Sequence, residues 1–315
     1  MRGNSQARFL GAWGWQQPPA TRYGLKRIQV TMDIKNGTIS EKIQTETSIV
    51  GFIDILGYES LVQRLQDNID IIYWLEKLIK DRLINFPQRL NRELSMENKV
   101  LVEYRSKIVR AISTKAISDT FLFTLYLDRL DFKAPSKTNF DPITDAIWTY
   151  FQMIEMFCLY FIAKTGHVFR GGLSIGKHYE SDLDYPGNLF IFSTSYLNAF
   201  KAEKKASYSR IIIDKELRSY LTSLNRFDYI KEHLYEDFDE ELCIHIYSFL
   251  ESDTEKDSNP EIILKDIKNG ISANILFNKD DARALKKLNY FANYHNNYLK
   301  ENAFQNSELY IKVEE

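Results

Sequence analysis

The chain has 315 residues, of which 44% are hydrophobic and 14% aromatic, enough apolar material for one sizeable core with a smaller appended piece. Lys and Arg number 41 against 43 Asp and Glu, so the basic excess typical of nucleic-acid-binding proteins is absent. The two cysteines, Cys158 and Cys243, lie in apolar runs and lack the spacing of a zinc site. We therefore expect a cytoplasmic protein without a nucleic-acid partner.

Neither the longest apolar stretch nor the N-terminal residues indicate a membrane protein. The longest apolar stretch, Ile147–Ala163, is interrupted by Gln152 and Glu155 and is shorter than the roughly 20 residues of a spanning helix. We expect a buried helix there and no membrane partner. Residues 1–44 mix arginines, tryptophans and prolines without the apolar core of a signal peptide. They predict an N-terminal extension that is disordered or partly derived from a mis-started reading frame upstream of Met32.

The first half of the chain predicts a strand, helices and a hairpin. A buried strand is expected over Thr45–Leu56, which is rich in β-branched and apolar residues. The spacing of apolar residues then becomes helical over Tyr58–Phe86, with a break near Asp67. Two further β-type runs, Ile108–Ile117 and Phe121–Leu127, flank a short polar tripeptide and predict a tight hairpin.

Helices and strands alternate in the part that follows. Pro142 suits the first turn of a helix that runs to Ala163. The stretch Gly166–Lys177 predicts a strand whose internal glycines mark a bulge or the close approach of a ligand or another backbone. A helix over Ser193–Ala206, a buried strand over Ile211–Ile213 and a helix from Asp214 complete the pattern.

This order of elements predicts a mixed α/β (α+β) fold of the ferredoxin-like or palm type. We expect residues 45–225 to form the catalytic domain, after the extension at residues 1–44. The pattern of apolar residues that predicts secondary structure weakens after about residue 225, and helical patterns return over Glu261–Ala303. Residues 226–315 are therefore predicted to form a mainly helical C-terminal appendage.

Two carboxylates lie where they suggest a metal site. Asp54 falls inside an apolar strand, where a carboxylate is costly unless it forms a salt bridge or binds a cation. Asp119 lies at the tip of the predicted hairpin, where an aspartate is more often a turn former. If the hairpin pairs beside the first strand, both side chains can converge on Mg²⁺ or Mn²⁺. These ions prefer oxygen ligands and retain positions for water and phosphate.

Three short motifs follow one another along the predicted domain: Phe52–Tyr58 (FIDILGY), Ser118–Thr120 (SDT) and Arg170–Gly176 (RGGLSIG). In this order they resemble three motifs of the class III nucleotidyl cyclase catalytic domain. These are the F-x-D-I-x-G-F strand, the hairpin that carries a second metal-binding aspartate, and the R-x-G-I-x-x-G strand. The resemblance spans about Ile49 to Ile213 and implies a phosphorus–oxygen lyase that uses two divalent ions, Mn²⁺ or Mg²⁺, per site.

Two further stretches, Ala199–Glu203 (AFKAE) and Ala206–Ile212 (ASYSRII), resemble the A-Y-x-x-E…A-x-Y-P-R-I-V pattern of the pyrimidine cyclases of bacterial Pycsar antiphage defence. This resemblance implies that UTP or CTP is converted to 3′,5′-cyclic UMP or cyclic CMP plus diphosphate. It also implies a homodimer with active sites at the subunit interface. The product would act on a cyclic-nucleotide-responsive effector in antiviral defence.

In the mechanism that this resemblance implies, Asp54, Asp119 and the backbone carbonyl of Ile55 hold the two ions on the triphosphate. The tethered ribose 3′-hydroxyl attacks the α-phosphorus and diphosphate leaves.

Three residues near these motifs are candidate substrate-binding groups. Phe52 and Tyr58 flank the first aspartate and are candidates to wall the ribose or base, although Phe52 suits a core position equally well. Arg170 precedes a double glycine that permits close approach, and a salt bridge to a neighbouring acid is its equally weighted alternative.

The sequence departs from the general cyclase pattern at one position. Class III enzymes carry an N-x-x-x-R pair on the helix after the R-x-G strand, whereas here Asn198 is followed by Ala202 at the arginine position. A cation for the transition state must then come from elsewhere. The candidates are Lys201, Lys204, Lys205 and Arg210. A solvated basic helix face is the alternative interpretation for most of them.

Three other functions remain open from the sequence. A purine cyclase with an unusual transition-state group would consume ATP or GTP. An inactive nucleotide-sensing dimerisation module would explain the missing arginine, although it gives no reason to keep Asp54 and Asp119. A palm-type polymerase or diguanylate cyclase would require a G-G-[DE]-E-F-like hairpin, which SDT does not supply. The choice between UTP and CTP depends on pocket contacts that the sequence does not locate.

Overall fold

A computed structural model describes residues 29–33, 38–42, 44–80, 99–135, 139–182, 189–251, 259–304 and 306–313. The chain divides into two compact units, Met1–Gln44 and Thr45–Glu315. In the first unit, β1 (Gln29–Asp33) pairs antiparallel with β2 (Thr38–Lys42). The predicted N-terminal extension includes this strand pair and stays a prediction, and residues 1–28, 34–37 and 43 lie outside the described part of the chain.

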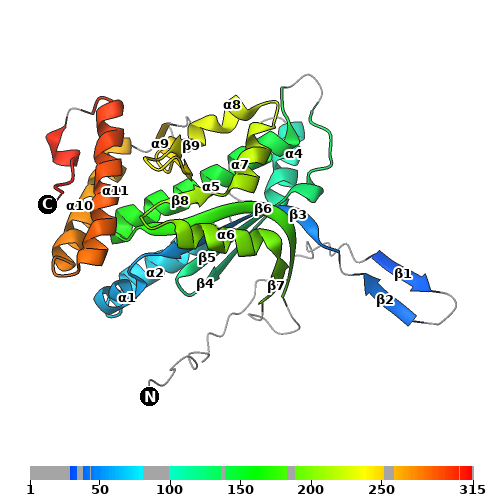
Figure 1. Cartoon of the computed structure of the whole chain (residues 1–315), viewed down its shortest axis with the longest axis horizontal. Helices are drawn as coiled ribbons and strands as arrows, with labels where there is room; N and C mark the ends of the chain where they lie inside the picture. Colours follow the sequence, from blue (N-terminus) through cyan, green and yellow to red (C-terminus); the bar gives the residue numbers. More distant parts are fainter. Residues whose placement is uncertain are drawn as a thin grey trace, which may run out of the picture. The chain divides into compact units, whose positions relative to one another are not determined.

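The second unit is built on a mixed sheet in which all described neighbours pair antiparallel except β6 and β8, which are parallel (Figure 1). Across the sheet the order is β4 (Ile112–Ile117), β5 (Thr120–Tyr126), β3 (Glu46–Ile55), β6 (Phe169–Asp182), β8 (Ile211–Ile213), β10 (Leu242–Ile244) and β9 (Leu234–Glu236). The strand β7 (Leu189–Ser193) pairs with the distal end of β6. The predicted mixed α/β fold is confirmed.

Helices occupy segments between these strands and the segment after β10. The described helices are α1 (Tyr58–Leu65), α2 (Ile69–Leu78), α4 (Lys99–Arg110), α5 (Pro142–Thr165), α6 (Thr194–Lys205), α7 (Lys215–Thr222), α8 (Phe227–Ile230), α9 (Ser248–Glu251), α10 (Pro260–Phe277) and α11 (Ala282–Glu301). Three predicted N-termini are confirmed by side-chain caps. Asp141, Ser193 and Asp214 accept hydrogen bonds from backbone N–H groups in the first turns of α5, α6 and α7.

The alternation of side chains along β3 separates the two faces of the sheet. Ile49 and Ile53 are fully buried in the larger core, which includes most of α5. Val50 belongs to a second cluster with Leu122 of β5 and Ala199 of α6. Helix α6 therefore covers the face opposite the larger core, and Figure 1 shows it crossing β6. Asp54 is four residues after Val50 in the same strand, so its side chain lies on the same face of the sheet, the one covered by α6.

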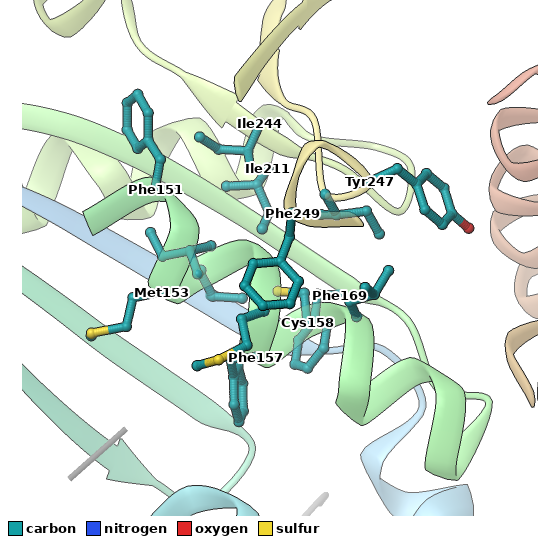
Figure 2. Close-up of a cluster of buried hydrophobic side chains, with 14 of the residues drawn as sticks. Phe151, Met153, Phe157, Cys158, Phe169, Ile211, Ile244, Tyr247 and Phe249 are labelled. Carbon is teal, nitrogen blue, oxygen red and sulfur yellow. The ribbon is translucent and has the colours of Figure 1, made fainter. Parts of the chain in front are cut away.

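Helix α5 forms the centre of the larger core. Among the described residues it is the one helix that passes a length and hydropathy test for membrane spans, and 78% of its most apolar window is buried inside the protein. Figure 2 shows part of the packing, in which Phe157 and Cys158 of α5 lie near Phe169 of β6. The Phe157 and Phe169 ring centroids are 5.6 Å apart. Both cysteines are buried free thiols, as the sequence predicted.

Two predicted boundaries are wrong. Residues 108–110, expected to begin a strand, end helix α4, because Tyr104, Ile108 and Val109 form its buried stripe at helical spacing. The predicted strand at Gly166 starts instead at Phe169, since Gly166 adopts a left-handed φ of 69° and ends α5. The part of the predicted helices at residues 81–86 lies outside the described residues.

The helical C-terminal region is present and packs closely on α5. A Cβ on Gly166 would collide with the backbone of Gly270 on α10, so these two helices meet at their glycines. Asn274 of α10 donates a hydrogen bond from Nδ2 to the Gly166 carbonyl oxygen at 2.9 Å. The short strands β9 and β10 extend the sheet past residue 225 and were not predicted. The predicted domain boundary at residue 226 stays a prediction. The residues on both sides of it belong to one compact unit.

Candidate active site

Asp54 lies near the end of the central strand β3, between two paired strands. It is aligned with Arg170 on β6 and with Thr120 on β5. Side chains that are aligned across antiparallel strands share one face of the sheet. The Asp54 carboxylate is therefore on the α6 face, where its side chain keeps 22% of its exposure. A carboxylate in this position is shielded from solvent but remains reachable by a ligand.

The β4–β5 turn brings Asp119 beside Asp54. Ile117 pairs with Thr120, so only Ser118 and Asp119 form the turn. Ser118 has a left-handed φ of 58°, which a tight hairpin requires at its first central position in a type II′ turn. The Ile55 N–H donates to the Asp119 carbonyl oxygen at 2.9 Å, which ties the tip of the hairpin to β3. The predicted convergence of the two aspartates is thereby built into the sheet.

Burial and neighbouring charges perturb the Asp54 carboxyl group. The pKa of Asp54 rises from 3.8 to about 6, first because burial disfavours its charge and then because of the nearby charges of Asp119 and Glu203. Arg170 lowers this pKa, and a hydrogen bond between the Asp54 and Asp119 carboxyl groups raises it further. Two carboxylates held this close repel each other when both are ionised. A cation between them would relieve that repulsion.

Arg170 joins this group through a residue that sequence reasoning missed. Its Nη2 lies 3.8 Å from Asp54 Oδ2 and also contacts Oε1 of Glu203 on α6. The Glu203 side chain is only 2% exposed. The salt-bridge alternative for Arg170 is thus present in the structure. The signal in the sequence was the AFKAE stretch, in which Glu203 is the acidic position, although no role was assigned to it from the sequence.

Close packing at Gly172 explains why Ala202 stands at the position where the general cyclase pattern has an arginine. A Cβ on Gly172 would lie 2.6 Å from the Cβ of Ala202 and would collide with the Ala199 carbonyl oxygen. The predicted close approach at the glycines of β6 is therefore the approach of another backbone, that of α6. Ala202 is 6% exposed and faces the strand, so a longer side chain at this position has no room. The position four residues after Asn198 does not accommodate an arginine.

The two aromatic candidates belong to different apolar clusters. Phe52 packs edge-on against Tyr196 and Phe200 of α6, with ring centroids 5.6 and 5.2 Å away. It is half-buried and lies two residues from Asp54 on the same face. Tyr58 begins α1 after Gly57, whose φ is 76°, and packs against the larger core. A role for either side chain in substrate binding stays a prediction.

The proposed transition-state cations are mostly engaged elsewhere. Lys205 pairs with Glu241, and Lys204 lies over the Phe200 ring at 4.8 Å from its centroid. Arg210 is 5% exposed and is held by Asp237 and by Asp239, the latter with two hydrogen bonds of 2.6 Å. Lys201 is exposed on α6.

The donor set fits a hard divalent ion that is completed by its substrate. Within the described residues, His, Cys, Asp and Glu side chains form no group of three or more that could hold a metal. Asp54 and Asp119 would supply carboxylate oxygens, and phosphate oxygens and water would supply the rest. The expected third protein ligand, the Ile55 carbonyl, belongs to the residue whose N–H binds the Asp119 carbonyl. Its role stays a prediction.

Comparisons with known proteins find no matching protein-family model and no matching curated protein. Among solved structures, the chain is similar to the dimeric guanylyl cyclase domain of the RhoGC fusion protein from the aquatic fungus Blastocladiella emersonii. The identity is 17% and the TM-score 0.33, over 63% of this chain and 94% of that one. The adenylyl cyclase CyaB from P. aeruginosa is 13% identical with a TM-score of 0.34, over 64% of this chain and 93% of that one. At these scores the similarity assigns neither a family nor an activity to the chain.

Proposed function

We propose that the chain is a nucleotidyl cyclase, which converts a nucleoside triphosphate into a 3′,5′-cyclic monophosphate and diphosphate. The observation that carries the proposal is the placement of Asp54 and Asp119. They come from a central strand and a hairpin tip, yet Asp119 directly precedes the residue beside Asp54 in the sheet, and burial, followed by the charge of Asp119, raises the pKa of Asp54 to about 6. An acid with a raised pKa beside a second acid, at a reachable edge of the sheet, is typical of functional sites.

The proposed reaction is an intramolecular displacement. The ribose 3′-oxygen loses its proton and forms a bond to the α-phosphorus, while the bond from that phosphorus to the bridging oxygen breaks and diphosphate leaves. Bound divalent ions would lower the pKa of the hydroxyl and neutralise the leaving group. Asp54 and Asp119 would orient the triphosphate by holding these ions. Arg170 lies beside them as a cation for phosphate oxygens.

The finer assignment rests on the sequence motifs. The AFKAE and ASYSRII stretches support UTP or CTP as substrate, cyclic UMP or cyclic CMP as product, and a cytoplasmic role in antiphage signalling to an effector. In this proposal Phe52, two residues from Asp54 on the same face, would contact the base or ribose.

Exposed apolar side chains support the proposed homodimer. Phe190 and Phe192 on β7 are 47% and 69% exposed, and Leu197 on α6 is 55% exposed. Exposed large apolar residues that gather on neighbouring elements favour an interface. A second copy of the chain is the occupant that the cyclase proposal requires.

One observation favours a second candidate, an inactive nucleotide-sensing module. Arg210 and Lys205 are neutralised by acidic partners, and Ala202 leaves no room for an arginine. Of the four proposed transition-state cations, these contacts remove two. Such a module would bind the triphosphate with its ions but would not turn it over.

The test incubates the purified protein with each of the four ribonucleoside triphosphates and Mn²⁺, and identifies products by mass. Cyclic UMP or cyclic CMP alone is the expected result, and a cyclic purine would overturn the pyrimidine assignment. Asp54→Ala and Asp119→Ala should abolish the product while the circular dichroism spectrum stays unchanged, because neither side chain belongs to the core. Triphosphate binding without any cyclic product would favour the sensing module over the cyclase.

A further inference from the structure

Arg170 is placed between two acids that it approaches with the same nitrogen. Its Nη2 contacts Oε1 of Glu203 on α6 and lies 3.8 Å from Oδ2 of Asp54 on β3. Glu203 is nearly fully buried, whereas the Asp54 side chain is 22% exposed. The closer and more strongly shielded partner of the guanidinium is therefore Glu203. The more accessible acid, Asp54, has the longer contact.

Nη2 makes both contacts of the guanidinium with these acids, so Arg170 does not form a bidentate ion pair with either acid. Its Nε is buried and makes no hydrogen bond within the described part of the protein. A hydrogen-bonded ion pair has an N···O distance of about 2.9 Å. Arg170 would therefore have to move roughly 1 Å to form a full ion pair with Asp54. Its contact with Glu203 opposes this movement.

Packing fixes Glu203 in its place. The backbone nitrogen of Glu203 would lie 2.6 Å from a Cβ on Gly172, so α6 rests directly on β6 at this residue. The neighbouring Ala202 faces the same strand. Because α6 packs tightly on β6 here, the backbone of Glu203 is held in place and its carboxylate stays beside Arg170. A charge held this way is suited to orienting another side chain.

We infer that Glu203 is a positioning residue, which retains the Arg170 guanidinium and so keeps the Asp54 carboxylate available to a divalent ion. This inference rests on the proposed function, in which Asp54 binds metal. An arginine that paired fully with Asp54 would compete with the ion for the same carboxylate oxygens. Glu203 gives the guanidinium a stronger partner, and Arg170 stays nearby to meet phosphate oxygens once the triphosphate arrives.

The first experiment measures Mn²⁺ binding to the full chain without nucleotide, by the loss of the free-ion electron paramagnetic resonance signal. Glu203→Gln keeps the shape of the side chain and removes its charge. We expect Mn²⁺ affinity to fall by about 10- to 100-fold, the usual range for outer-shell partners of a metal site. Glu241→Gln is the matched control, because Glu241 pairs with Lys205 at the end of the same helix. Its Mn²⁺ affinity should equal that of the wild type.

A double-mutant cycle with Arg170→Met distinguishes two ways in which Glu203 can affect Mn²⁺ affinity: by positioning Arg170, or directly through its own negative charge. If Glu203 acts through Arg170, Glu203→Gln should change Mn²⁺ affinity less than about threefold when Arg170 is already replaced. If Glu203 acts only by its own negative charge, the loss will be equally large in both backgrounds, and the inference is overturned.

A crystal structure of metal-free Glu203→Gln supplies a second measurement, should Arg170→Met alone fail to fold with Glu203 left unpaired. We expect the 3.8 Å separation of Arg170 and Asp54 to shorten into the hydrogen-bonding range of about 2.9 Å. An unchanged separation would overturn the inference. A wild-type protein that binds no Mn²⁺ would instead count against the proposed metal site itself, so the two failures are distinguishable.

Discussion

Replacement of Asp54 by asparagine should stabilise the metal-free protein at neutral and alkaline pH, although it should abolish activity. The folded protein holds this carboxyl in a setting that disfavours its charge, through burial and through Asp119 and Glu203. Ionisation of Asp54 therefore opposes folding. Asparagine has nearly the same shape and no charge to ionise. The residue that the proposed chemistry most requires is thus one that weakens the fold in the absence of metal.

The size and the pH range of this effect follow from the pKa of Asp54. Its rise from 3.8 to about 6 corresponds to about 3 kcal/mol between the protonated and ionised forms. Because the side chain is 22% exposed, solvent screening reduces this figure, and we expect a gain of about 1–2 kcal/mol. For a raised folded pKa, the wild type has this stability in full below pH 3.8 and loses it as the pH rises through about 6. The advantage of the variant should therefore appear across that interval.

Urea unfolding of wild type and Asp54→Asn in the presence of a chelator, at several pH values between 4 and 8, measures this difference. The free energy of unfolding of the variant should exceed that of the wild type at pH 8, and the two should converge near pH 4. The matched control is Asp67→Asn, since Asp67 is exposed in the turn between α1 and α2. It should show no such gain. A variant that is less stable than the wild type at pH 8, or a gain that is the same at every pH, would refute the reasoning.

Three further expectations follow from other contacts. Gly172→Ala should lower stability by about 1–3 kcal/mol and also reduce activity, because the added methyl forces α6 away from β6; thermal unfolding and a turnover assay measure both, and an unaffected protein would contradict the packing. Glu155→Ala should lower stability by about 3 kcal/mol, since buried Ser248 and His233 lose their shared partner at 2.9 Å; an unchanged melting temperature would contradict this. Phe192→Glu should yield a monomer in light scattering and lose activity, and an active dimer would move the interface elsewhere.

The parts of the fold that were predictable are those in which local patterns and tertiary packing agree. The strand Glu46–Ile55 and the helix Pro142–Thr165 each have a strong apolar pattern, the helix also has a start signal at Pro142, and both lie where the sequence indicated. The short strands β9 and β10 were not predictable, because three residues form no period. They exist because the edge of the sheet at β8 offers them hydrogen-bonding partners.

The candidate site shows the same division between local and long-range information. Asp54 was recognisable because a carboxylate within an apolar strand contradicts its surroundings, and Asp119 because it follows at a hairpin tip. Glu203 was not recognisable as a partner of Arg170, since the two meet only after α6 packs across β6. The sequence contains both charges but no local pattern that pairs them. Contacts of this kind depend on the tertiary fold.

The arrangement around Asp54 combines a rigid frame with an unfavourable charge. Three carboxylates and one guanidinium meet on one face of the sheet, so the metal-free site carries an excess of negative charge. Hairpin backbone bonds and the Gly172 contact keep these groups from moving apart. Because the frame cannot relax, the repulsion remains until a cation binds. Added Mn²⁺ should therefore raise the melting temperature of the wild type but not of Asp54→Asn. An equal rise in both proteins would place the stabilising ion outside this site.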